Sequence, residues 1–102
     1  MDGGGWAIGL VRTGRAWDTG TGLGQQKLMG EHMAYLRRLM EAGEVTQAGP
    51  VLGAEEGPAQ DGLVGLIIYA VDAERASALA TGDRGVRSGL ITVDIRPWYT
   101  DI

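Results

Sequence analysis

The chain has 102 residues, and its composition and charge limit what it can do. A hydrophobic content of 44% with 22% charged residues is typical of one globular domain, which we expect to span residues 1–102. The formal net charge of −4 argues against binding to nucleic acid and to an anionic membrane surface, since both need a basic patch. Because the chain has no cysteine and only one histidine, we expect no disulfide and no metal site.

The first residues, MDGGGWAIG, contain neither the basic region nor the apolar region of a signal peptide, and no apolar run approaches the length of a membrane span. We therefore expect a cytoplasmic protein. Eighteen glycines and no phenylalanine leave little bulk for a core. A domain with a thin core often completes itself by association, which favours an oligomer.

The chain begins with a predicted strand at Trp6–Arg12, where apolar and β-branched residues follow one another. A loop of glycine, threonine and charged residues occupies Thr13–Gly24, and its composition predicts a mobile segment. An amphipathic helix then runs from Gly24 to Gly43, and this second glycine stands where many helices end.

The middle of the chain is expected to form two neighbouring strands. Glu44–Leu52 is the second strand, and Pro50 indicates an edge or a bulge late in it. A polar turn region at Gly53–Gly62 ends in Asp-Gly. Leu63–Val71 is the third strand, and its unbroken apolar run indicates burial on both faces.

The last third of the chain predicts a short helix and a final strand. Asp72 is a suitable N-cap for a helix over Ala73–Ala80, Thr81–Gly89 is a loop, and Leu90–Trp98 is the last strand. The β-α-β-β-α-β order predicts a ferredoxin-like α+β fold, a four-stranded antiparallel sheet with two helices on one face. The uncovered apolar face predicts a homodimer in which two sheets pair as a dimeric α+β barrel.

One titratable side chain, His32, lies in the middle of the apolar face of the long helix. At about 100° per residue, three leucines fall within about 40° of it. They are Leu28, Leu36 and Leu39. A buried imidazole needs a hydrogen-bond partner. Such a histidine is most often a core residue bonded to a carbonyl, and a functional site is the alternative.

Several short motifs occur in order along the chain. They comprise His32, Tyr35 and Leu36 in the helix, Gly43, Gly49 and Pro50 around the second strand, Asp83, Val86 and Gly89 before the last strand, and Val93, Pro97 and Trp98 within it. In this order and spacing the chain resembles the YCII-related (YciI-like) family over essentially its whole length. The departure is Arg84, where the family usually has proline.

The resemblance implies ferredoxin-like domains that dimerise into an α+β barrel, with a dyad of a helix histidine and a loop acid, here His32 and Asp83. A carboxylate bonded to one ring nitrogen fixes the tautomer and leaves the other nitrogen to exchange a proton. Since a related member eliminates from a small cyclic acid, the resemblance implies an isomerase- or lyase-type enzyme without a cofactor, acting on a small carboxylic acid or lactone. The alternative is a non-catalytic, small-ligand-binding or accessory dimer, in which the pair only shapes a pocket.

Four further residues are candidate substrate contacts. Arg12, at the end of the first strand, and Arg87, four residues past the dyad acid, could each bind a carboxylate bidentately. The glycine-rich loop carries Arg15 and Trp17, which could contact a ligand if the loop is a lid. The alternatives are solvated or interface salt bridges for the arginines and an ordinary exposed loop.

Overall fold

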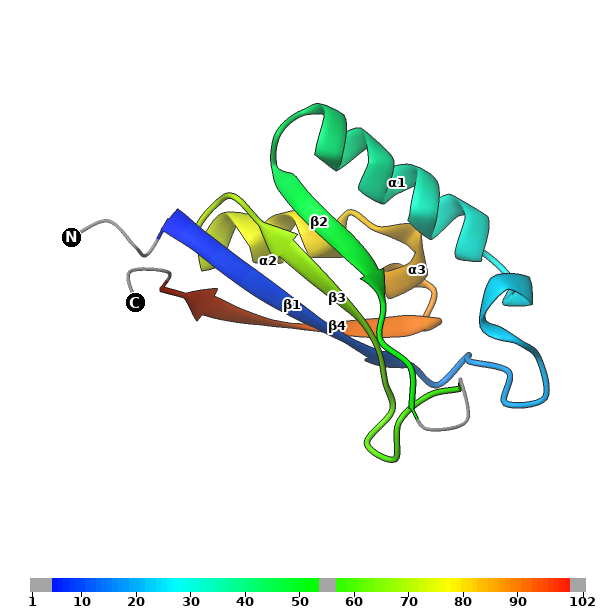
Figure 1. Cartoon of the computed structure of the whole chain (residues 1–102). Helices are drawn as coiled ribbons and strands as arrows, with labels where there is room; N and C mark the ends of the chain where they lie inside the picture. The colour runs from blue at the N-terminus through cyan, green and yellow to red at the C-terminus, as the bar shows by residue number, and fades with distance from the viewer. Residues whose placement is uncertain (1–4, 54–56, 100–102) are drawn as a thin grey trace.

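The computed structural model describes residues 5–53 and 57–99. The strands are β1 (Trp6–Thr13), β2 (Val45–Pro50), β3 (Leu63–Tyr69) and β4 (Ile91–Trp98). They form one antiparallel sheet in the order β2-β3-β1-β4. The helices are α1 (Met29–Glu41), α2 (Ala73–Thr81) and the short α3 (Arg84–Arg87). All three lie on the same side of the sheet (Figure 1), which confirms the ferredoxin-like α+β fold.

Two segments differ from the expectation. The long helix begins at Met29 rather than Gly24, because residues 23–25 form a separate 3-10 turn and Leu28 has a left-handed backbone (φ 71°). A left-handed residue cannot continue a right-handed helix. The predicted loop Thr81–Gly89 contains α3, which begins after Asp83 because that side chain accepts a hydrogen bond from the backbone N–H of Gly85.

The ends of the other elements follow the expected signals. The side chain of Asp72 accepts a hydrogen bond from the backbone N–H of Arg75 at 2.9 Å and so caps α2. Gly43 follows the end of α1 with φ +77°, a conformation that favours glycine. Pro50 lies in β2 and Pro97 in β4, the two outer strands of the sheet, where a missing N–H costs least.

The two faces of the sheet are covered differently. Ala7 and Val11 of β1 are buried toward the helices, together with Ile67 and Tyr69 of β3. The side chains between them point to the other face and are only half-buried; they include Ile8, Leu10, Leu66 and Ile68. The burial predicted for both faces of the third strand is therefore complete only on the helix side. The uncovered face, which we call the open face, has these apolar side chains at its centre and charged side chains such as Arg12 and Asp94 beside them.

The loop between β1 and the 3-10 turn is held by a buried glutamine. The Gln26 side chain is 5% exposed and accepts a hydrogen bond from the backbone N–H of Asp18. Its amide nitrogen donates to the carbonyl oxygens of Asp18 and Thr21 at 2.7 and 2.8 Å. These hydrogen bonds fix Asp18 and Thr21 of the loop to Gln26. The mobility expected for residues 13–24 stays a prediction. No helix in the described part of the chain is long and apolar enough to cross a membrane.

Tyr69 gives a prediction about alkaline pH. Its side chain is buried, and burial, followed by the charge of Asp83, raises the pKa of its hydroxyl well above 10. Above about pH 10 an unfolded tyrosine loses its proton while the folded one keeps it, so the free energy of unfolding should fall as pH rises. We expect Tyr69→Phe to flatten this decline between pH 9.5 and 11 in urea titrations. An unchanged slope would contradict the assignment.

Candidate active site

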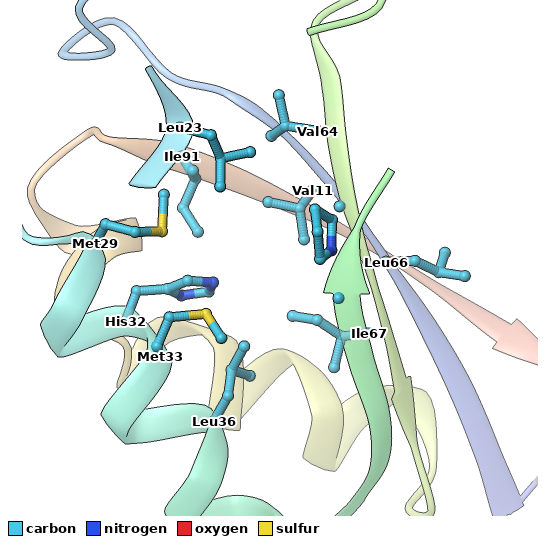
Figure 2. Close-up of a pocket in the computed structure, with 13 residues that line it drawn as sticks. Val11, Leu23, Met29, His32, Met33, Leu36, Val64, Leu66, Ile67 and Ile91 are labelled. Atoms are coloured by element: carbon cyan, nitrogen blue, oxygen red, sulfur yellow. The ribbon is translucent and has the colours of Figure 1, made fainter. Parts of the chain in front are cut away.

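His32 lies in the first turn of α1, with its side chain directed toward the sheet. Its backbone N–H donates to the carbonyl oxygen of Leu28, the left-handed residue that precedes the helix. The whole residue is 6% exposed. Figure 2 shows the imidazole between Met29 and Met33, extending from α1 into the space in front of β3.

Asp83 is the hydrogen-bond partner of this imidazole. Its Oδ2 lies 2.5 Å from His32 Nδ1, and the residue is 3% exposed. Its Oδ1 accepts the backbone N–H of Gly85 at 2.8 Å, so both carboxylate oxygens are held. Because Nδ1 is bound to the carboxylate, Nε2 is the ring nitrogen left for a ligand.

The contact between α1 and α3 beside the dyad depends on a glycine. A Cβ atom placed on Gly85 would lie 3.2 Å from Asp83 Oδ1 and 3.3 Å from His32 Cβ, closer than side chains normally approach. Arg84, the first residue of α3, stands where the family pattern has proline, a residue favoured at that helical position. Its guanidinium instead pairs with Glu31 of α1 at 3.1 Å, on the exposed side of the same contact.

A small cavity lies between α1 and the sheet, with His32 in its wall (Figure 2). The space open to the centres of water molecules is about 50 Å³, room for roughly three to five waters. The side chains around the imidazole are apolar and include Val11, Met29, Met33, Leu36, Ile67 and Ile91. Half-buried Leu23 and exposed Pro50 also line it, which places its mouth between the 3-10 turn and the edge of β2.

The charge of Asp83 acts on two neighbouring tyrosines. Burial is the main reason that the pKa of Tyr35 is raised, and the Asp83 charge raises it further. Tyr69 responds to the same two causes in the same order. The hydroxyl of Tyr35 donates to the carbonyl oxygen of Leu79 at 2.8 Å and joins α1 to α2. The negative charge of Asp83 therefore disfavours ionisation of both tyrosine hydroxyls, in addition to the effect of burial.

The structure brings His32 and Asp83 together, but it places the four other predicted site residues elsewhere. Arg12 belongs to the open face and pairs with Asp61 and Asp94 at 3.6 and 3.7 Å. Exposed Arg15 packs its side chain beside Gly89.

Trp17 is half-buried against the core and lines a separate hollow with the 3-10 turn and Pro58. Arg87 is exposed in a hollow beside α1 and α3 that also holds Arg38 and Arg84. Neither Trp17 nor Arg87 lines the His32 cavity, and the roles proposed for them stay predictions. Within residues 5–53 and 57–99 no group of three or more acidic, histidine or cysteine side chains could hold a metal ion.

Several residues that form this cavity have no recognisable site motif in the sequence. Met29 and Met33 pack in or against the hydrophobic core and also line the cavity wall, whereas Met40 of the same helix is 38% exposed and lies outside it. Gly49 and Pro50 reach the cavity from β2, and only the Gly-Pro pair of the family pattern marked them. Gly85 carries no sequence signal of its own, because its role is a close approach between distant segments.

Gly85 and Gly30 give a matched pair of substitutions. Gly85→Ala adds a methyl group against the dyad and should lower the free energy of unfolding by about 1–3 kcal/mol. Gly30→Ala, at an exposed position of α1 with no heavy atom within 4 Å, should raise it by about 0.5–1 kcal/mol. Urea denaturation measures both. Equal stability of the two variants would contradict the close packing at Gly85.

Comparisons with known proteins identify relatives of this chain by sequence and by fold. A search of curated proteins gives no match. Among solved structures, the fold is similar to 5-chloro-2-hydroxyhydroquinone dehydrochlorinase (TftG) from Burkholderia phenoliruptrix AC1100, in complex with 2,5-dihydroxybenzoquinone. The TM-score is 0.61 and the identity 22%, over 91% of each chain. The model of the YCII-related domain matches residues 20–99, and the chain therefore belongs to the YCII-related family.

Proposed function

We propose that the protein is a small cofactor-independent enzyme that performs isomerase- or lyase-type acid–base chemistry on a small organic acid or lactone. The observation that carries this proposal is the buried hydrogen bond between His32 and Asp83, next to a cavity that the imidazole lines. A solvent-shielded imidazole with one nitrogen fixed by a carboxylate is the arrangement that general acid–base catalysis uses.

The proposed reaction begins with proton transfer. His32 Nε2 takes a proton from a carbon next to a carbonyl group; the C–H electrons form a double bond to the carbonyl carbon, and the carbonyl π electrons move to oxygen to give an enolate. In an isomerisation, the enolate re-forms its carbonyl and takes the proton back from the imidazolium at another carbon of the conjugated system. In an elimination, the enolate re-forms its carbonyl, a carbon–carbon double bond forms between the α and β carbons, and the leaving group departs from the β carbon with its electron pair. Asp83 holds the ring and stabilises the imidazolium. The dehydrochlorinase of similar fold supports the elimination, because its name denotes the loss of HCl.

Substitution of the dyad tests this step. In D2O, the protein should exchange the hydrogen beside the carbonyl of a small lactone for deuterium, which NMR follows without knowledge of the natural substrate. His32→Asn should reduce this exchange about 10²- to 10⁴-fold, the usual contribution of a general base. Asp83→Asn should reduce it less, since the base remains but loses its orientation and its stabilising charge.

A second candidate is a non-catalytic binding protein or accessory dimer. It is favoured by the cavity wall, in which, among the described residues, every lining side chain other than that of His32 is apolar. In that case both dyad substitutions would leave exchange at the background rate and would mainly lower the melting temperature. Far-UV circular dichroism of each variant separates loss of chemistry from loss of folding.

We further propose that the protein is a homodimer joined through the open face. Ile8 and Ile68 lie opposite each other in the register of β1 and β3, and Leu10 and Leu66 form the next pair. At the end of this row the rings of Trp6 and Trp98 pack edge to face, with centroids 6.3 Å apart. Contiguous apolar side chains without cover typically form a protein interface.

Ile68→Arg tests the dimer. A guanidinium in the centre of the open face would be buried without a partner, so light scattering at micromolar concentration should give a monomer mass. Ala34→Arg introduces the same charge at an exposed position of α1 and should leave the mass unchanged. A wild-type protein that is already monomeric would contradict the dimer.

A further inference from the structure

We infer that the His32 cavity selects electrically neutral ligands, so that lactones and other uncharged carbonyl or hydroxyl compounds bind there whereas carboxylates of the same size do not. This inference rests on the proposed function in that it takes the cavity as the ligand site. It narrows the proposed substrate class from acids and lactones to the neutral members.

The basic side chains all lie away from the cavity. The chain has nine lysine and arginine residues, and all of them fall within the described ranges. None lines the cavity. Arg12 is paired with two aspartates on the open face, and Arg87 belongs to an exposed hollow beside α1 and α3. A carboxylate in the cavity would therefore have no arginine or lysine to pair with.

The dyad itself has no net positive charge that could attract a carboxylate. With a neutral imidazole, the pair of His32 and the Asp83 carboxylate has a net charge of minus one. With an imidazolium, the two charges cancel at 2.5 Å. A bound carboxylate would thus add a negative charge to a pair that is already negative or neutral. A buried charge that is not paired is strongly disfavoured.

The side chains of the cavity wall are apolar apart from His32. Apart from the imidazole, the lining side chains are hydrocarbon or thioether, as Ile67 and Met33 illustrate. Such a wall gives no hydrogen bond to replace the water that a carboxylate loses on entry. A neutral ligand loses far less hydration than a carboxylate on entering such a site, and a ligand hydroxyl can donate its hydrogen to the lone pair of His32 Nε2.

The single histidine gives a direct measurement of binding. Because the chain has only one, the imidazole signals in a proton–nitrogen NMR spectrum belong to His32 without further assignment. At pH 7, the spectrum is titrated with two pairs of probes of matched skeleton: γ-butyrolactone with 4-hydroxybutyrate, and benzamide with benzoate. We expect the neutral member of each pair to shift the His32 signals with an affinity at least about tenfold higher than its carboxylate partner, a difference of about 1.4 kcal/mol.

Two variants of α1 serve as a matched test of the charge argument. Met33→Arg introduces a guanidinium at the cavity, and it should let the carboxylates bind and so reduce or reverse the preference. Met40→Arg makes the same change on the same helix, outside this cavity, and should leave the preference unchanged.

Carboxylate binding to the wild type that equals or exceeds binding of the neutral partners would overturn the inference. It would also be overturned if no probe shifted the His32 signals at millimolar concentration. The proposed function can fail independently of this inference. If neutral probes bound as expected while His32→Asn left deuterium exchange unchanged, the proposed enzyme activity would be wrong and the ligand selectivity would stand.

Discussion

The hydrogen bond between His32 and Asp83 is the constraint on which the geometry of the site depends. It joins two residues that are 51 positions apart and connects α1 with the segment between α2 and β4. Since the carboxylate is 3% exposed, the loss of its imidazole partner would leave a buried charge unpaired, at a cost of about 3–5 kcal/mol. The same imidazole lines the cavity between α1 and the sheet.

Much of the fold could be predicted from the sequence, because strand composition, helix caps and turn glycines each depend on only a few neighbouring residues. The apolar and β-branched residues of β1, the N-cap at Asp72 and the glycine at Gly43 each act within a few residues, and the structure confirms them. The wrong start of α1 came from Leu28, whose left-handed backbone no propensity predicts for a leucine. The missed α3 is only four residues long, too short for any periodicity to identify.

The dyad was predictable in a different way. The helical wheel placed His32 in the core, but only the family pattern suggested Asp83 as its partner. In the structure the two side chains form a hydrogen bond. The cavity wall was not predictable, because residues from α1, β1, β2 and β3 meet there only after folding. The surroundings of the arginines were not predictable either: Arg12 pairs with an aspartate on the open face, Arg87 lies in an exposed hollow, and their roles stay predictions.

The two prolines in the outer strands have a consequence for how copies of this chain can associate. An outer strand normally offers a row of unpaired N–H and carbonyl groups, onto which a strand of another molecule can add. Pro50 in β2 and Pro97 in β4 each remove one donor from such a row, and a register shift between Val45 and Gln47 further disrupts β2. Growth of the sheet from either edge into an open-ended fibre is thereby disfavoured.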